Sequence, residues 1–214
     1  MASIDPSIET DPRNLLGLSP NSNQLSSYLE SLAERKGISN TLVPVPEIKT
    51  YPDALYMNYY TLGLSLMFVA RDGSKNIKKE DVDSDKLALD SIDIYNNLFS
   101  NSKDAPSTNT YQNHPVSEII LPLAPYKDKK ERPKEVKLTP SSSGKYLVGE
   151  LGEPDRKGGG GGPSKGSIDI WCEWTSDGIM VEFGGEEAKG PKAWETGKDA
   201  KWKVLTLFRL NGSK

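Results

Sequence analysis

Two glutamates on an expected β-hairpin are the residues whose type and spacing could perform acid–base chemistry in this chain. Residues 168–183 alternate apolar and polar side chains on either side of Asp177-Gly178, which is typical of a hairpin with a two-residue turn. Such a turn places Glu173 directly opposite Glu182, with their Cβ atoms about 5 Å apart. Carboxyl pairs at this range can hydrolyse glycosides, so one hypothesis is a hydrolase acting on a glycan or another polar substrate.

The alternative interpretation of this carboxylate pair is structural. Water could solvate both groups, or Lys203 or Arg209 on the next expected strand could neutralise them. The corresponding positions of an earlier hairpin would place Asn58 opposite Met67. The carboxylate pair is therefore expected in one half of the chain alone.

The same alternation divides the hairpin into an apolar face and a mixed face. The apolar face is expected to pack beneath a helix and consists of Ile170, Cys172, Trp174, Ile179, Val181 and Phe183. The mixed face carries Trp171 and Met180 beside the glutamates, with Tyr56, Tyr60 and Met67 on the related hairpin. Exposed aromatic residues and methionine are typical of protein-binding surfaces. We expect either a partner protein or another part of this chain to cover this face.

Composition excludes several other kinds of site. The 214 residues carry a net charge of −3, which disfavours sequence-independent binding of nucleic acid. A single cysteine and a single histidine exclude an intrachain disulfide and any multi-thiolate or His-rich metal site, so no metal or cofactor is expected. The sequence contains neither an apolar run of about 20 residues nor a signal peptide. These features predict a cytosolic protein without a membrane span.

Four isolated features have simple structural interpretations. The run Gly158–Gly162 lacks the Gly-Lys-Ser/Thr order of a phosphate-binding loop and is expected to be a flexible loop. His114 precedes a proline in a polar stretch and is expected at the surface. Cys172 is expected to be a small apolar filler. Trp194 either anchors a Gly- and Lys-rich loop to the core or stacks on a ligand.

The elements that position these residues form an α+β pattern that occurs twice. Leu25, Tyr28, Leu29 and Leu32 have helical spacing before Gly37, and a hairpin over 54–70 and a strand over 86–96 follow. A second helix ends at Gly152, and its hairpin and third strand match the first set at offsets of 115 and 113 residues. The sequence therefore predicts a tandem duplication of a helix plus three-stranded antiparallel meander, forming a two-layer body.

The expected organisation divides the chain into four segments. Residues 1–14 are a disordered arm, 15–96 the first repeat, 97–137 a linker with a hairpin, and 138–214 the second repeat, both repeats lying in one compact domain. Flexible loops are expected near 71–85, 97–115 and 157–166.

The second repeat resembles a known small module. Its Leu151, Gly152 and Pro154, with Trp174 and the run 178–183, are similar to the helix-plus-meander repeat of beta-lactamase-inhibitory-protein-like and SmpA/OmlA-type domains. The chain lacks the cysteine pairs of the secreted inhibitors and the lipidation cysteine of the outer-membrane proteins. The whole chain also resembles a family of uncharacterised conserved fungal proteins. The resemblance implies a sheet face offered to a partner and transfers no catalytic residue.

Three functions remain open on these grounds. The favoured hypothesis is a non-enzymatic cytosolic binding or adaptor protein that contacts a protein partner through Trp171, Met180, Tyr56, Tyr60 and Met67. The second is a hydrolase that uses Glu173 and Glu182. The third is a carrier of a small ligand in a pocket between the repeats.

Overall fold

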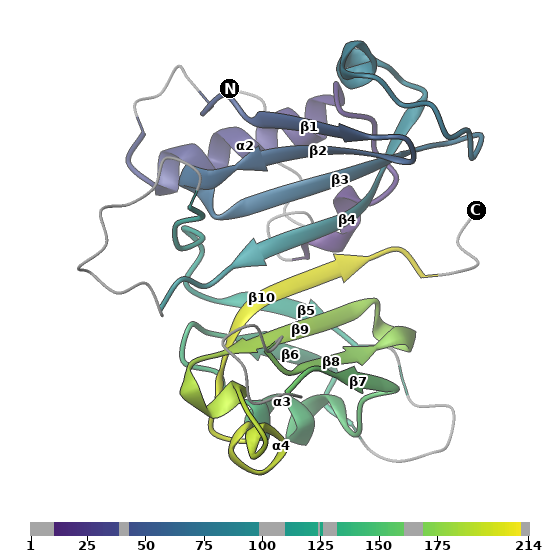
Figure 1. Ribbon diagram of the computed structural model, residues 1–214. Coiled ribbons are helices and arrows are strands. Elements are labelled where there is room, and N and C mark those ends of the chain that lie inside the picture. Colours follow the sequence, from purple (N-terminus) through teal and green to yellow (C-terminus); the bar gives the residue numbers. More distant parts are fainter. Residues whose placement is uncertain are drawn as a thin grey trace.

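One eight-stranded antiparallel sheet forms the centre of the computed structural model, which describes residues 11–38, 43–98, 110–123, 125, 132–160 and 169–210 (Figure 1). Its strand order is β1-β2-β3-β4-β10-β9-β8-β7. The bounds are β1 Glu47–Tyr51, β2 Ala54–Tyr59, β3 Leu64–Ala70, β4 Leu87–Tyr95, β7 Arg156–Gly158, β8 Trp171–Trp174, β9 Ile179–Gly184 and β10 Lys201–Phe208. Together with its helices, this sheet confirms the α+β class.

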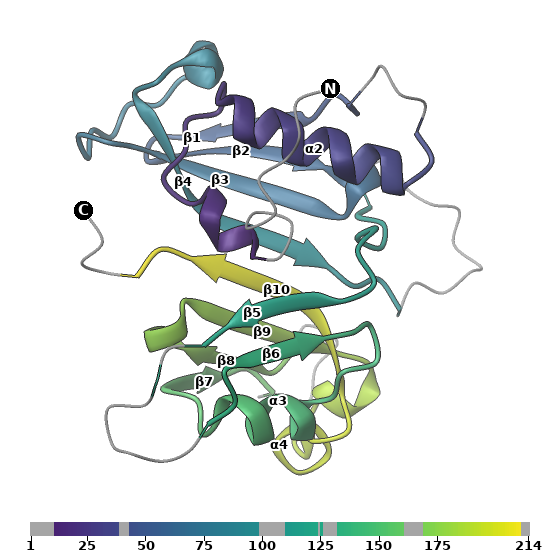
Figure 2. The same ribbon diagram turned by 180° about the vertical axis from the view of Figure 1, so that it is seen from behind.

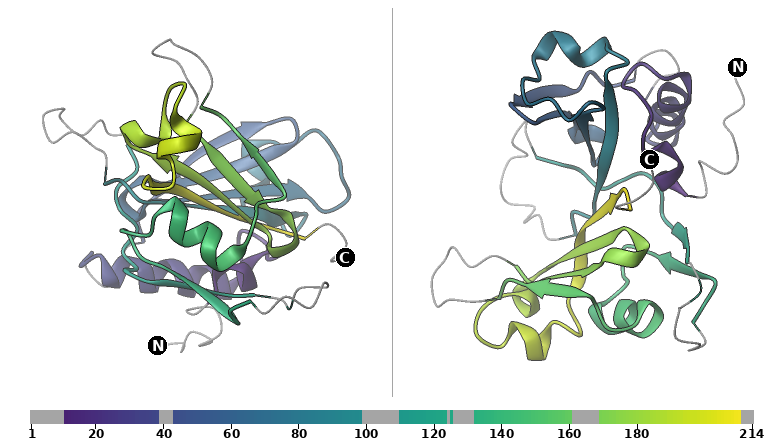
Figure 3. Two further views of the ribbon diagram at one scale, coloured as in Figure 1. Left: turned by 90° about the horizontal axis from the view of Figure 1, so that it is seen from below. Right: turned by 90° about the vertical axis from the view of Figure 1, so that its right-hand side faces the viewer.

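One face of the sheet is covered and the other is open. Helix α2 (Asn23–Arg35) lies behind β1–β4, whereas α3 (Gly144–Leu151) and the separate hairpin β5 (Ile119–Pro122)–β6 (Glu135–Leu138) lie behind the second half of the sheet (Figure 2). Figure 3 shows α2 and α3 on the same side of the sheet. The face turned toward the viewer in Figure 1 carries no comparable cover among the described residues.

The expected helices and apolar faces pack as their periodicity predicts. Ser22 caps α2 by accepting a hydrogen bond from the backbone N–H of Leu25, and the helical stripe Leu25, Tyr28, Leu29 and Leu32 is buried. The six residues assigned to the apolar face of the second hairpin are all buried. One apolar cluster joins both halves of the sheet.

Short helical turns complete the described chain. They are η1 Pro12–Leu15, η2 Tyr60–Leu62, η3 Lys79–Asp83, η4 Thr175–Asp177, η5 Glu186–Ala188 and α4 Ala193–Thr196. No helix within the described ranges has the length and apolar character needed to cross a membrane.

The central turns of both meanders have the same form. η2 leads into Gly63 with φ 57°, and η4 leads into Gly178 with φ 66°, and this left-handed conformation favours glycine. The strands pair outside these turns, Tyr59 with Leu64 and Trp174 with Ile179. The expected two-residue turn at Asp177-Gly178 is therefore wrong, because four residues connect the strands.

Several expected loops and arms are ordered where they are described. Asp11–Asn14 were assigned to a disordered arm, yet Pro12 starts a 3₁₀ turn whose Leu15 is buried; residues 1–10 lie outside the described residues. Ile77 is buried within the expected loop 71–85. Strand β1 precedes the expected hairpin over 54–70 and pairs with β2 along its whole length.

The glycine run is also ordered in its first part. Gly158 ends β7 opposite Trp171, and Gly159 and Gly160 have φ of 82° and 75°. A Cβ at Gly158 would lie 2.6 Å from the Trp171 ring. The expected flexibility is thus wrong for these three glycines, because close packing requires them; residues 161–168 lie outside the described residues.

Candidate functional site

The two glutamates of the proposed hydrolase are not opposite one another. Glu173 pairs with Met180, and Glu182 pairs with Trp171. The predicted pairing is wrong because the four-residue turn shifts the register by two residues. The same shift occurs in the first half, where Asn58 lies opposite Ser65 instead of Met67.

Each glutamate has its own cation. Arg156 Nη1 lies 3.3 Å from Glu173 Oε2, and Lys203 Nζ lies 2.7 Å from Glu182 Oε1 and 3.0 Å from Asp169 Oδ2. Burial lowers the pKa of Lys203, but its hydrogen bonds to the two carboxylates outweigh burial and raise it overall. These ion pairs correspond to the structural alternative, with Arg156 and Lys203 as the cations. Because the two carboxylates lie at different register positions and pair with different cations, they do not form the facing carboxyl pair on which the hydrolase hypothesis depends.

The five residues predicted to bind a partner fall into two separate groups. Tyr56 and Tyr60 line a cavity over the first half of the sheet, and Met67 lies opposite Tyr56 in the register. Trp171 and Met180 lie on β8 and β9, outside that lining. The sheet therefore separates residues that the sequence pattern assigned to one surface.

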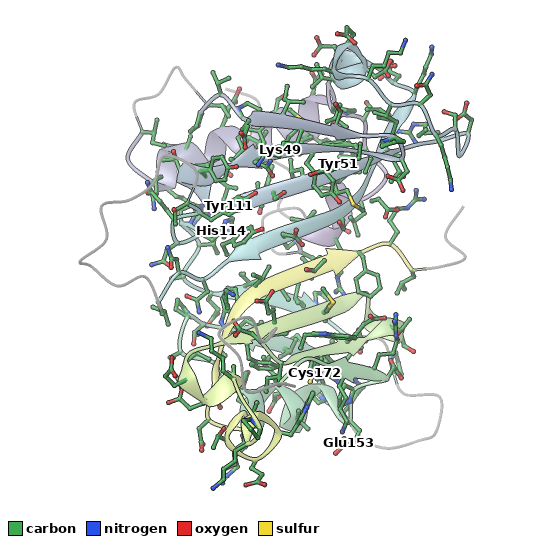
Figure 4. The ribbon with its side chains drawn as sticks, viewed as in Figure 1. Lys49, Tyr51, Tyr111, His114, Glu153 and Cys172 are labelled. Carbon is green, nitrogen blue, oxygen red and sulfur yellow. The ribbon has the colours of Figure 1, made fainter. Side chains whose placement is uncertain are left out.

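A wide, open cavity lies over the first half of the sheet. Its volume is about 640 Å³, within the range of about 300–1,000 Å³ typical of small-ligand sites. Its lining comes from β1–β4 and the 110–115 segment: Lys49, Tyr51, Pro52, Asp53, Tyr56, Asn58, Tyr60, Ser65, Asp93, Tyr95 and Tyr111. Figure 4 shows Lys49, Tyr51 and Tyr111 on this open side.

Tyrosines form the two walls of this cavity. Tyr51 and Tyr56 meet edge-to-face, with ring centroids 5.7 Å apart. Tyr111 stacks on Tyr95 at 3.7 Å with an interplanar angle of 4° and approaches Tyr60 at 4.6 Å. Tyr51 remains 53% exposed. Such rings offer a large, rigid contact area to a partner at a small cost in conformational entropy.

Polar residues form the floor, because successive register pairs bring Asn58, Ser65 and Asp93 into one row across β2, β3 and β4. Asn58 Oδ1 accepts hydrogen bonds from Ser65 Oγ at 2.8 Å and from Tyr111 Oη at 2.6 Å. Asp93 Oδ1 accepts a hydrogen bond from Thr206 Oγ1 at 2.7 Å. Burial raises the pKa of Asp93, and the nearby charge of Glu182 raises it further. The floor is therefore fixed in place and rich in acceptors.

Tyr111 was not predicted as a site residue, because it lies in the expected linker 97–115. This segment packs against the turn of the first meander: Gln112 N donates to Tyr60 O, and His114 N donates to Tyr95 O. His114 was expected at the surface and is instead half-buried, with Nδ1 3.1 Å from Leu62 O. Burial lowers its pKa to about 4. No short-range pattern predicts this docking, because its contacts with Tyr60 and Leu62 join residues about fifty positions apart in the sequence.

A smaller cavity of about 340 Å³ lies in the second half. Its lining includes Cys172, Trp194 and three lysines, Lys145, Lys157 and Lys198. Cys172 is buried, as expected of an apolar filler, and burial raises its pKa to about 11. Trp194 is 46% exposed, and Lys157 Nζ lies 5.6 Å from its ring centroid. A third cavity, of about 260 Å³, lies where the two halves meet, since its lining includes Tyr95 and Tyr111 of the first half and Lys203 of β10.

Comparisons with protein-family models, with curated proteins and with solved structures found no match. Within the described part of the chain, no three His, Cys, Asp or Glu residues are placed to hold a metal ion. The geometry of the open face is therefore the basis on which a function can be proposed.

Proposed function

We propose that this chain is a non-enzymatic binding protein that receives a partner protein on the open face of its sheet. The observation that carries the proposal is the tyrosine-walled cavity over β1–β4, whose polar floor is held by internal hydrogen bonds. Aromatic residues in a preorganised concave surface are the usual centres of protein interfaces. The site is thus centred on Tyr56 and Tyr60, and not on Trp171 and Met180.

We also propose that the framework is a tandem duplication arranged in two layers. Equivalent residues support this: Leu66 pairs with Ile92 in the first half, and Val181 pairs with Leu205 in the second. These pairs correspond at the offsets of 115 and 113 residues expected from the sequence. In a duplicated framework, the two halves can keep the same core and differ at the surface. One half can then bind a partner protein while ion pairs stabilise the other.

A matched pair of substitutions tests the binding proposal. Tyr56 and Trp171 are equivalent at the offset of 115, and both are half-buried on the same face of the sheet. We expect Tyr56→Ala to weaken partner binding at least tenfold, as loss of a central aromatic residue does. Trp171→Ala should change it less than threefold.

The readout is affinity capture from native lysate by tagged wild type and both variants, quantified by mass spectrometry. Thermal unfolding of each variant shows that it is folded. Retention of every captured protein by Tyr56→Ala, or their loss in Trp171→Ala alone, would contradict a binding site in the first half.

A further inference from the structure

Asp93 is a carboxylate on the floor of the cavity that forms no ion pair within the part of the chain that the structure describes. Asp93 uses one oxygen to accept from Thr206, and among the described residues no ion pair includes Asp93 or the lining residue Asp53. Burial raises the pKa of Asp93, so its ionised form is unfavourable in the folded protein. A cation bound in the cavity would offset this cost.

The ammonium groups close to Asp93 are already paired. Lys49 Nζ lies 3.0 Å from Glu47 Oε2, and the Tyr60 hydroxyl also donates to Glu47. Lys203 lies between Glu182 and Asp169. Among the described residues that line the cavity, the charged groups are Lys49, Asp53 and Asp93, so one ammonium group stands with two carboxylates, and Lys49 is itself paired with Glu47. This excess of negative charge favours a cationic ligand.

The walls favour a particular kind of cation. The faces of tyrosine rings attract cations, and burial, together with the charge of Asp93, raises the pKa of Tyr56, Tyr95 and Tyr111. A guanidinium group is planar, stacks on aromatic rings and is less strongly hydrated than an ammonium group. It also carries five N–H donors, which the acceptors of this floor can receive.

We propose that the cavity binds the guanidinium group of an arginine side chain from the partner protein, with the Asp93 carboxylate as its counter-ion between the tyrosine walls. This assignment rests on the proposed function and specifies the chemistry of the partner. An Asp–Arg pair flanked by aromatic rings is also the kind of fully desolvated contact that dominates the affinity of an interface.

Blocked amino acids test the assignment without the partner. The full chain is titrated with N-acetyl-arginine amide, N-acetyl-citrulline amide and N-acetyl-lysine amide, and ¹H–¹⁵N spectra are recorded. Citrulline keeps the shape of arginine and lacks its charge. We expect arginine to shift the amide signals of Asn58, Ser65 and Asp93 and to bind at least tenfold more tightly than citrulline. If citrulline bound as tightly as arginine, the positive charge would not be what the cavity recognises. If lysine bound more tightly than arginine, the preferred cation would be an ammonium group and not a guanidinium group.

Two variants locate the counter-ion. Asp93→Asn is nearly isosteric and should weaken arginine binding at least tenfold, whereas Asp199→Asn changes an exposed aspartate in the turn before β10 and should have no effect. Unaltered arginine binding by Asp93→Asn would overturn the proposal.

Partner capture by the two variants distinguishes failure of the arginine assignment from failure of the proposed binding function. If Tyr56→Ala loses the partner while Asp93→Asn retains it with full affinity, the arginine assignment fails and the proposed function stands. If neither variant changes partner capture, both proposals fail. Loss of the partner in both variants supports both.

Discussion

The two halves of the sheet share a covered face and differ on the open one. In the first half, Tyr56 and Asp93 line a cavity and Asp93 has no cation among the described residues. In the second half, the equivalent surface carries the ion pairs Arg156–Glu173 and Lys203–Glu182. Apolar side chains of both halves join one core. The halves differ on the open face, and this difference is the basis on which the binding site is proposed for the first half.

The turns of the two meanders show the same contrast. Gly63 and Gly178 have nearly the same left-handed conformation. Gly63 lies beneath Gln112 and His114 of the segment that supplies Tyr111, whereas Gly178 packs against the carbonyl of Phe208 on the neighbouring strand. One turn thus contacts a wall of the cavity, whereas the other contacts β10 and, through Asp177, the side chains of Arg13 and Arg132.

Substituting these two glycines should give the largest effects. A Cβ at residue 63 would clash with Gln112 O and lie 2.7 Å from His114 N, and a positive φ adds strain. Gly63→Ala should cost about 2–4 kcal/mol in the free energy of unfolding and release Tyr111 from Tyr95. Gly178→Ala should also destabilise the fold, because its Cβ would lie 2.5 Å from Phe208 O, but it should leave Tyr111 in place.

Urea unfolding measures the stability of both glycine variants, and the ring-current shifts of Tyr95 and Tyr111 report the stacking. Unchanged Tyr111 signals in Gly63→Ala would contradict the role assigned to the first turn.

Acidification should lower the stability of the folded protein, because His114 of the first half binds a proton less readily when folded than when unfolded. Its pKa of about 4 in the folded protein lies below the ordinary value near 6.5, so the unfolded chain takes up this proton first. The contribution of His114 to stability is therefore fully present above pH 6.5 and is lost as the pH falls toward 4, by about 2–3 kcal/mol.

Urea unfolding of wild type and His114→Gln at pH 7, 5.5 and 4 isolates this effect, because the other titrating groups are common to both proteins. The stability difference between the two proteins should shrink or reverse on acidification. A difference that stays constant over this range would show that His114 is not buried as a neutral ring.

Neutralising Asp93, which has no ion pair among the described residues, and neutralising Glu182, which is paired with Lys203, should change the stability of the protein in opposite directions. The raised pKa of Asp93 means that its contribution to stability is lost as the pH rises from about 4 through its folded value. At pH 7, Asp93→Asn should therefore stabilise the protein, because the amide can still accept from Thr206 and avoids the cost of a buried charge. Glu182→Gln removes an ion pair and should destabilise it by about 0.5 kcal/mol, since Lys203 is 42% exposed.

Thermal unfolding at pH 7 compares these two variants directly. If Asp93→Asn were the less stable protein, Asp93 would be an ordinary structural carboxylate and the contrast between the halves would disappear.

The sequence predicted the elements of this fold better than their pairing. Helix α2, both central hairpins and strands β4 and β10 follow from apolar spacing, since burial on one face directly sets that period. The register did not follow, because a two-residue turn and a 3₁₀ turn ending in a left-handed glycine share the same Asp-Gly signature. That error of two residues created the apparent pairing of Glu173 with Glu182.

The candidate site was predictable only where it depends on alternation along a single strand. Alternation along β2 correctly assigned Tyr56 to the open face, but it could not show that Asn58, Ser65 and Asp93 form one polar row. Tyr111 is positioned by contacts with strands far away in sequence. Such long-range docking leaves no local pattern to recognise.

The most direct test of the central claim places a photoreactive benzoylphenylalanine at position 56 or at the equivalent position 171. Each protein is irradiated in native lysate, and covalent adducts are identified by mass spectrometry. We predict a specific adduct from position 56 that excess N-acetyl-arginine amide suppresses, and none from position 171. A specific adduct from position 171 alone would place the binding surface in the second half and contradict the account.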